Sequence, residues 1–177
     1  MKGRSASSFD PPVPALVHAL KYQGWRRVAD FAGERMARLA RLEWEAWRPD
    51  LVVPVPTTSI RRRERGYNPA GLLAASVARI LGIPCVQALV RPREGPRQVG
   101  LPPSQRAANV RDVFNPDGAL SGALRCQNVL LVDDVLTTGS TGAEAARVVG
   151  RCGAREVALV TFARALPETP GSGGTPD

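Results

Sequence analysis

The sequence predicts an α/β domain with a mainly parallel central sheet flanked by helices. Segments with helical spacing of apolar residues alternate with short apolar runs rich in valine and leucine, which is the pattern of strands joined by helical crossovers. The length of 177 residues suits one hydrophobic core. With 44% hydrophobic and 23% charged residues, the composition is that of a globular protein, which excludes wholesale disorder and collagen-like repeats.

The N-terminal quarter of the chain predicts a flexible segment followed by two helices. Residues 1–12 are polar and rich in Ser and Pro, so we expect a flexible N-terminus. Apolar residues recur at helical spacing in 13–22 and again in 26–47, where arginines occupy the other face. Gly24 separates the two predicted helices, and Pro49 ends the second.

The middle of the chain predicts two strands on either side of a loop and a helix. The valine-rich run 51–56 indicates a buried strand, and the polar residues 57–68 indicate an arginine-dense loop. Small apolar residues at helical spacing predict a helix over 70–81, and 85–90 is a second candidate strand. Residues 91–109 contain four prolines and two glycines without a clear period, so we expect a long functional loop there.

The last third of the chain predicts a further strand–turn–helix–strand unit. In chain order these elements are a buried strand, a turn rich in hydroxyls, an alanine-rich helix and another strand: 128–132, 133–141, 142–150 and 156–162. Gly, Pro, Ser and Thr dominate the end of the chain. We therefore expect one domain over 13–166 and a disordered tail over 167–177.

Positive charge is concentrated in one segment. The chain has 24 basic and 16 acidic residues, a formal net charge of +8. Residues 61–111 contain ten arginines and two acidic residues, so the surplus lies there. Such a surplus indicates a phosphate-bearing or nucleic-acid partner that contacts this segment.

The three cysteines do not form a metal-binding or disulfide pattern. Cys85, Cys126 and Cys152 are far apart and include no CxxC pair, so we expect lone thiols in a reducing compartment and no zinc site. The first ten residues lack the apolar stretch of a signal peptide, and no run approaches the ~20 apolar residues of a membrane helix. These features predict a cytoplasmic protein without a membrane segment.

The segment with the clearest chemistry is 129–141, VLLVDDVLTTGST, in which an apolar strand leads into the carboxylates of Asp133 and Asp134. Ligands of open α/β sheets bind at the carboxyl ends of strands. The hydroxyl-rich turn that follows presents backbone N–H groups at the start of a helix, which suits a phosphate, and Gly139 allows close approach. The carboxylates suit sugar hydroxyls or Mg²⁺. These groups together indicate a phosphorylated sugar, and a helix-capping role for the acidic pair is the plain alternative.

This segment resembles the 5-phosphoribosyl-1-pyrophosphate (PRPP) binding motif of type I phosphoribosyltransferases. The resemblance implies the type I fold, with an N-terminal helical hood over the site. It implies that Asp133 and Asp134 contact the ribose hydroxyls as the catalytic pair and Mg²⁺ directly or indirectly. It assigns the 5-phosphate to five residues of the turn: Thr137, Thr138, Gly139, Ser140 and Thr141. Purine-salvage members often have Asp where this chain has Thr137, so the resemblance does not favour hypoxanthine–guanine salvage.

A second resemblance covers residues 14–163. The motifs LKYQG at 20–24, VPVP at 53–56 and RRRERGYN at 61–68 are similar to those of the ComF family. So is a spaced set further along the chain: Gln98, Leu101, Arg106, Asn109 and Phe114. The resemblance implies a phosphoribosyltransferase-like protein linked to DNA uptake in natural competence, with a helicase-type competence partner. Family members usually begin with a four-cysteine zinc ribbon, and these cysteines are absent from this sequence.

Two arginine-bearing segments are the candidate contacts for the pyrophosphate. Residues 57–68 follow a strand end, where the pyrophosphate loop lies in this fold, and Arg65 is the first candidate with Arg62 the second. By resemblance, 91–109 is the flexible catalytic loop, and its candidate residues are Gln98, Arg106 and Asn109. The alternatives are a solvated basic loop and a dispensable surface loop.

Three functions remain open at this point. The first is Mg²⁺-dependent transfer of the phosphoribosyl group of PRPP to an acceptor, with pyrophosphate as the leaving group. The second is a non-catalytic competence accessory that senses PRPP or serves as a scaffold. The third is binding of single-stranded DNA through residues 61–111. The sequence does not identify the acceptor or the oligomeric state.

Overall fold

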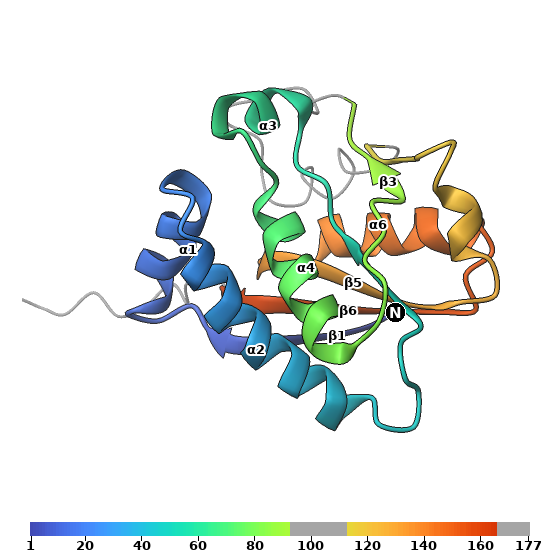
Figure 1. Ribbon diagram of the computed structural model, residues 1–177, viewed down its shortest axis with the longest axis horizontal. Coiled ribbons are helices and arrows are strands. Elements are labelled where there is room, and N and C mark those ends of the chain that lie inside the picture. Colours follow the sequence, from blue (N-terminus) through green and yellow to red (C-terminus); the bar gives the residue numbers. More distant parts are fainter. Residues whose placement is uncertain (93–112, 166–177) are drawn as a thin grey trace, which may run out of the picture.

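A parallel sheet forms the centre of the protein. The structure, a computed structural model, describes residues 1–92 and 113–165 (Figure 1). Four strands lie side by side in this spatial order: β1 (Lys2–Ser8), β6 (Glu156–Arg164), β5 (Asn128–Leu136) and β2 (Leu51–Pro54). Each neighbouring pair is parallel. An isolated parallel bridge between Val52 and Cys85 adds to the outer edge of β2.

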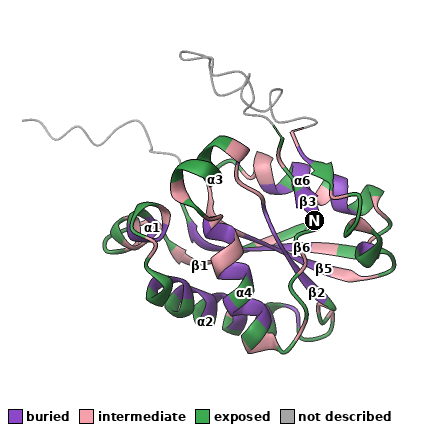
Figure 2. Cartoon of the chain, turned by 45° about the horizontal axis from the view of Figure 1, so that its top comes forward, coloured by how far each residue is buried: buried purple, intermediate pink, exposed green. Residues whose placement is uncertain are grey.

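Helices cover both faces of the sheet (Figure 1). One face packs against three of them: α1 (Val13–Tyr22), α2 (Arg26–Glu43) and α4 (Pro69–Leu81). The other face packs against α6 (Ser140–Arg151). Because side chains alternate along a strand, Leu130 and Val132 of β5 join the first core, whereas Val129 and Leu131 join the second. Figure 2 shows these buried positions along the strands and on the inner sides of α2 and α4.

Four short elements complete the fold near the edge formed by β2. They are α3 (Ser59–Arg65), the 3-10 helix η1 (Ser121–Leu124), and the strands β3 (Leu89–Val90) and β4 (Asn115–Pro116), which pair in antiparallel fashion. The hydroxyl of Ser59 donates a hydrogen bond to the carbonyl of Pro92, 3.4 Å away. This contact joins the start of α3 to the segment that follows β3.

The N-terminus differs from the expectation of a flexible segment over 1–12. Lys2–Ser8 pairs with β6 along its length, from Lys2 opposite Ala158 to Ser8 opposite Arg164. The hydroxyls of Ser5 and Thr161 also lie 2.7 Å apart across the pair. The strand is held by backbone hydrogen bonds at the edge of the sheet, so its side chains need not be apolar. The polar sequence therefore showed no strand pattern.

Other boundaries also differ from the sequence expectations. The predicted loop 57–68 contains the helix α3. Thr58 precedes the helix, and its hydroxyl accepts a hydrogen bond from the backbone N–H of Arg61 (3.3 Å). The helix ends at Gly66, which has φ +78°. No residue of α3 is buried, so the helix left no apolar periodicity in the sequence. The predicted helix 26–47 ends at Glu43. The predicted strand 85–90 is reduced to the Cys85 bridge and the two residues of β3.

Some expectations concern residues outside the described part of the chain. These are the loop residues Gln98, Arg106 and Asn109 and the disordered tail over 167–177. Within residues 1–92 and 113–165, none of the helices combines the length and the apolar character that crossing a bilayer requires.

Candidate functional site

The acidic pair lies inside β5 rather than in the turn after it. Asp133 stands opposite Thr161 of β6, and the pairing continues to Leu136 opposite Arg164. On the other side of β5, the backbone N–H of Val55 donates to the carbonyl of Val132 (2.8 Å). Both carboxylates therefore lie in the last part of β5, just beyond the carboxyl end of the neighbouring strand β2, and ligands of open α/β sheets bind at this edge.

Both carboxylates line a polar cavity of about 250 Å³, which we call the Asp133 pocket. Its other walls come from the end of α1, the loop after β2, α3, the start of α4, the segment after β3 and the first turn of α6. The polar and charged residues around the acidic pair are Lys21, Tyr22, Thr57, Arg61, Arg65, Asn68, Arg91 and Thr141. Segments far apart in the sequence thus bring two acids and four basic side chains to one space.

The two carboxylates have different electrostatic environments. The carboxylate of Asp134 lies 3.1 Å from the ammonium group of Lys21, with the side chains 15% and 27% exposed. The backbone N–H of Asp134 donates to Oδ1 of Asp133 (2.8 Å). Burial, followed by the charge of Asp134, raises the pKa of Asp133 to about 8. The backbone hydrogen bond and the positive charges of Lys21 and Arg91 oppose this rise. The net effect favours the protonated form of Asp133.

Hydrogen bonds tie the end of α1 to the arginine-bearing segment. The hydroxyl of Tyr67 donates to the carbonyl of Leu20 (2.7 Å) and accepts from the backbone N–H of Gly24 (2.9 Å). The side-chain amide of Asn68 donates to the carbonyl of Val55 (3.1 Å). These bonds hold α1, the loop after β2 and the start of α4 in one arrangement around the pocket.

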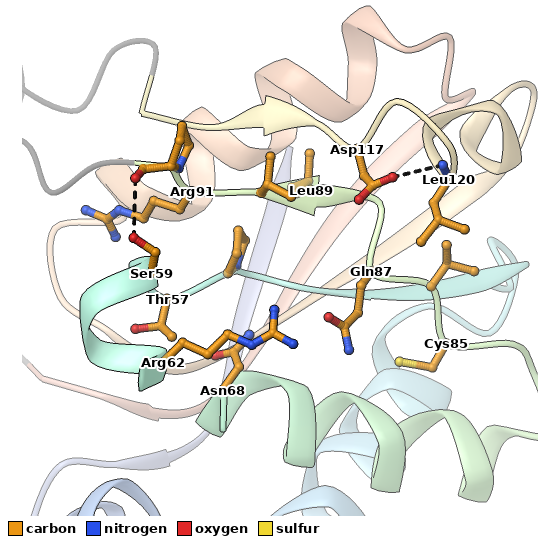
Figure 3. A pocket seen from close by; sticks show the side chains of 14 residues that line it. Thr57, Ser59, Arg62, Asn68, Cys85, Gln87, Leu89, Arg91, Asp117 and Leu120 are labelled. Atoms are coloured by element: carbon orange, nitrogen blue, oxygen red, sulfur yellow. Dashed lines mark hydrogen bonds between the residues drawn. The ribbon is translucent and has the colours of Figure 1, made fainter. Parts of the chain in front are cut away.

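The arginines of α3 divide between two cavities. Arg61 and Arg65 line the Asp133 pocket, and the guanidinium of Arg65 lies 4.8 Å from the ring centroid of Tyr22. Arg62 lines a neighbouring cavity of about 570 Å³, which we call the side cavity (Figure 3). Of the two arginines selected from the sequence, the structure therefore brings Arg65 to the acidic pair and places Arg62 beside it.

The hydroxyl-rich turn leads from β5 into α6. Gly139 has φ +80°, a conformation that favours glycine, and α6 begins at Ser140. The hydroxyls of Thr138 and Ser140 are 2.9 Å apart, and Thr138 Oγ1 also accepts from the backbone N–H of Ser140 (3.4 Å). Thr141 lines the Asp133 pocket, whereas Thr137 and Thr138 are exposed at its α6 side. The turn thus offers hydroxyls and a helix N-terminus next to the carboxylates.

Sequence reasoning missed two residues of the site. Lys21 was not selected, although it is one of only two lysines in a chain whose other 22 basic residues are arginines. Its rarity and its place in the LKYQG motif were signals in the sequence, but its contact with Asp134 joins distant parts of the chain. Arg61 was likewise not chosen as a candidate among the neighbouring arginines. Tyr22, at the end of α1, also lines the pocket.

The residues around the acidic pair do not build a metal site by themselves. In the described ranges no three His, Cys, Asp or Glu side chains group to hold a metal ion. The cysteines Cys85, Cys126 and Cys152 are free thiols. Two carboxylates with a lysine on one of them suit a Mg²⁺ ion that brings further oxygen ligands with a substrate.

Comparison with known proteins identifies the family. Residues 33–170 match the family described as "Phosphoribosyl transferase domain". The chain is 33% identical to "DNA utilization protein YhgH" of Salmonella typhimurium, over 92% of this chain and 71% of that protein. It is 35% identical to "Competence protein F" of Haemophilus influenzae, over 66% of this chain and 51% of that protein. A purine phosphoribosyltransferase from Pyrococcus horikoshii is similar in structure, with a TM-score of 0.48 and 22% identity, over 86% of this chain and 80% of that one.

The match to the phosphoribosyl transferase domain agrees with the parallel sheet and its flanking helices, and it confirms the fold class expected from the sequence. The matches also confirm the expected family, since the relatives include both competence protein F and the YhgH proteins. The chain belongs to the phosphoribosyl transferase domain family and, within it, to the ComF type.

Proposed function

We propose that the protein binds PRPP in the Asp133 pocket and transfers its phosphoribosyl group to an acceptor, with pyrophosphate as the leaving group. The observation that supports this most directly is the placement of the acidic pair. Asp133 and Asp134 lie at the end of β5, between the hydroxyl-rich start of α6 and two arginines of α3. This arrangement offers separate places for a phosphate, for sugar hydroxyls and for a second, more highly charged phosphate group.

The turn and the acidic pair would hold the phosphoribosyl group. We assign the 5-phosphate to the hydroxyls and backbone N–H groups of Thr137, Thr138, Gly139, Ser140 and Thr141, at the positive end of α6. We assign the ribose hydroxyls to Asp133 and Asp134. The carboxyl group of Asp133 forms a hydrogen bond with one ribose hydroxyl, and the carboxyl group of Asp134 forms one with the other. The carboxylate of Asp134 also stabilises positive charge that develops on the sugar as pyrophosphate leaves.

Arg65 and Arg61 are the proposed pyrophosphate contacts, because both line the pocket that contains the acidic pair. The stack on Tyr22 holds the guanidinium of Arg65 over the pocket without using its N–H donors. Arg62, the second candidate from the sequence, lies on the wall of the side cavity, so we do not place it on the pyrophosphate.

Asp133 and Asp134 are the residues that would contact Mg²⁺, together with oxygens of PRPP. When bound, Mg²⁺ supplies positive charge that stabilises the departing pyrophosphate. Lys21 must leave Asp134, or share it, for such a contact to form. The residues of this chain then position the sugar, present arginine charge to the leaving group and shield the pocket from water.

A second candidate function is a protein that binds PRPP without transferring it, as a sensor or scaffold in competence. One observation favours it. Among the described residues that line the Asp133 pocket, Asp133 and Asp134 are the only carboxylates, and none is histidine. His18, the one histidine of the chain, instead packs against Tyr22 with 4.8 Å between ring centroids. Apart from the acidic pair, the described lining of this pocket therefore offers no carboxylate or imidazole to accept a proton from an incoming nitrogen nucleophile.

Titration calorimetry with PRPP, with and without Mg²⁺, tests both candidates. Wild type is compared with Asp133→Asn/Asp134→Asn and with Glu34→Gln/Glu45→Gln, which removes two exposed acids elsewhere. Saturable, Mg²⁺-dependent binding of PRPP that only the Asp133→Asn/Asp134→Asn variant loses supports the site. Absence of PRPP binding to wild type overturns both candidates.

An assay of pyrophosphate release separates the two candidates. Release of pyrophosphate with ammonia or free nucleobases as acceptors supports transfer. Binding without release under every acceptor supports the sensor.

The relatives named for DNA utilization and competence suggest a role in DNA uptake, with a helicase-type partner and contact with single-stranded DNA. The exposed arginines of α3 are the described surface that suits a phosphate backbone. Affinity for single-stranded DNA that falls steeply with salt, and weakens when Arg61, Arg62 and Arg63 are replaced together, supports this role. An affinity for single-stranded DNA that does not change with salt concentration opposes this role. The free thiols fit the cytoplasm, which we propose as the location.

A further inference from the structure

The side cavity adjoins the Asp133 pocket, and the proposed transfer does not use it. Its volume of about 570 Å³ lies in the range of small-molecule sites. Its walls come from α3, the segment around β3, and Asp117–Leu120 (Figure 3). We propose that the side cavity binds a nucleoside monophosphate, with the phosphate at Arg62 and the base directed toward Asp117. This site is separate from the Asp133 pocket and does not depend on the proposed transfer.

Arg62 supplies the anion-binding end of the cavity. Its side chain extends from α3 into the space between Asn68 and Gln87 (Figure 3). Among the described residues, the guanidinium of Arg62 forms no ion pair with a carboxylate. A planar guanidinium with open donors matches two phosphate oxygens.

The opposite end of the cavity carries negative charge. Oδ1 of Asp117 accepts hydrogen bonds from the backbone N–H groups of Ala119 (3.0 Å) and Leu120 (3.2 Å), which fixes the carboxylate in place. An anionic group is repelled from this end and attracted to Arg62, so the cavity orients a ligand that has one charged end. A hydrogen-bond donor, such as the exocyclic amine of a base, suits the remaining oxygen of Asp117.

The space between the two ends suits a flat, partly apolar body. Leu89 and Leu120 form an apolar wall, and Leu120 is 43% exposed although it lines the cavity. Gln87 points to the side of the cavity where Arg62 lies and offers both a donor and an acceptor (Figure 3). Inorganic phosphate alone would leave this wall and the Asp117 end unused. A base, a sugar and one phosphate would use all three regions.

The two cavities share part of their walls, which gives the second site a route to affect the first. Pro56, Thr57, Asn68 and Arg91 line both. A ligand that shifts or orders these residues in one cavity changes the other cavity, and the effect on affinity is reciprocal. Occupation of the side cavity is therefore expected to alter the affinity for PRPP.

Calorimetric titration with AMP tests the site, with inorganic phosphate and adenosine as the two halves of the probe. Arg62→Ala is expected to weaken AMP binding by about tenfold or more. Arg63→Ala is the matched control, because it removes the same charge from the next exposed position of α3 and does not line either cavity. It is expected to change the affinity less than about twofold. Asp117→Asn keeps the acceptor for the turn and is expected to weaken adenosine more than phosphate.

Cys85 gives a second measurement that reports position. It lines the side cavity and not the Asp133 pocket. In a Cys126→Ser/Cys152→Ser background it is the remaining thiol, and saturating AMP is expected to slow its reaction with a disulfide reagent. Asp133→Asn/Asp134→Asn is expected to keep AMP binding, which separates this result from a failure of the proposed PRPP site.

Three results would overturn the proposal. The first is an absence of AMP binding to wild type. The second is an equal loss of affinity in Arg62→Ala and Arg63→Ala, which would show attraction to the charge of α3 as a whole. The third is a loss of binding in the Asp133→Asn/Asp134→Asn variant with no effect of Arg62→Ala, which would place AMP in the Asp133 pocket.

Discussion

The ammonium group of Lys21, at the end of α1, lies 3.1 Å from the carboxylate of Asp134, at the end of β5. Both side chains are largely withdrawn from water, and this ion pair connects the helical N-terminal region to the edge of the sheet that carries the acidic pair. It also places a positive charge where a substrate-bound Mg²⁺ would otherwise contact Asp134. Lys21 thus acts as the resident counter-ion of the acidic pair.

Replacement of Lys21 by methionine is expected to make the acidic pair receptive to Mg²⁺ alone. Without the ammonium group, the negative charge of Asp134 lacks its partner, and Mg²⁺ in the absence of PRPP should raise the melting temperature of Lys21→Met more than that of wild type. Lys2→Met, at the only other lysine, is the control and should behave as wild type. An equal response of all three proteins to Mg²⁺ would contradict the counter-ion role.

The raised pKa of Asp133 predicts how stability depends on pH. Its pKa is about 8 in the folded protein and near the ordinary 3.8 when unfolded, so the folded state binds the proton more tightly. The contribution is fully present below the unfolded pKa and is lost as the pH rises from about 4 to about 8. Urea unfolding of wild type and Asp133→Asn across this range should show the variant gaining relative stability as the pH rises. A constant difference between the two proteins would oppose the assignment.

The hydroxyl of Tyr67 is expected to stabilise both the fold and the pocket. Tyr67→Phe removes the hydroxyl that donates to the carbonyl of Leu20 and accepts from the backbone N–H of Gly24. Both backbone groups then lose that hydrogen bond. The free energy of unfolding should fall by about 1–3 kcal/mol, measured with urea. Tyr22→Phe is the control, because its hydroxyl forms no hydrogen bond with the residues that the structure describes and its ring under Arg65 is kept. Equal effects of the two substitutions would argue against the Tyr67 tie.

Arg65 is expected to contribute to PRPP affinity through the geometry of its guanidinium. Arg65→Lys keeps the charge but loses the planar donors and the stack on Tyr22, so PRPP binding should weaken by about tenfold. Arg63→Lys makes the same change at an exposed position outside the pocket and should bind as wild type. Calorimetry with PRPP and Mg²⁺ measures both, and unchanged binding by Arg65→Lys would remove Arg65 from the site.

Deletion of residues 1–8 tests whether the N-terminal strand belongs to the domain. Removal of β1 exposes the backbone edge of β6 along its whole pairing. We expect a lower melting temperature and concentration-dependent light scattering. A truncated protein that melts and scatters as wild type does would support the flexible N-terminus expected from the sequence.

Patterns that repeat over a few neighbouring residues were enough to predict much of the fold. The valine- and leucine-rich cores of β2, β5 and β6 and the helical spacing in α1, α2, α4 and α6 are visible in the sequence. Each of these elements buries one face or one stripe, so its apolar residues recur with the period of a strand or of a helix. The strand–turn–helix order of residues 129–141 also followed from the sequence, because its acids, glycine and hydroxyls are adjacent in the chain.

The remaining features depend on contacts between distant segments, which leave no local pattern. β1 is polar and is held by backbone pairing with β6, and α3 buries none of its residues, so neither shows apolar periodicity. The partner of Asp134 is Lys21, which lies far away in the sequence. Arg62 and Arg65 line different cavities because of how α3 is oriented in the fold. The sequence by itself determined the buried strands and the helices with an apolar face, because local apolar spacing specifies them, and it determined the acidic motif, because its residues are adjacent in the chain. Only the tertiary structure decided which charges meet, because those distances depend on how the helices pack around the sheet.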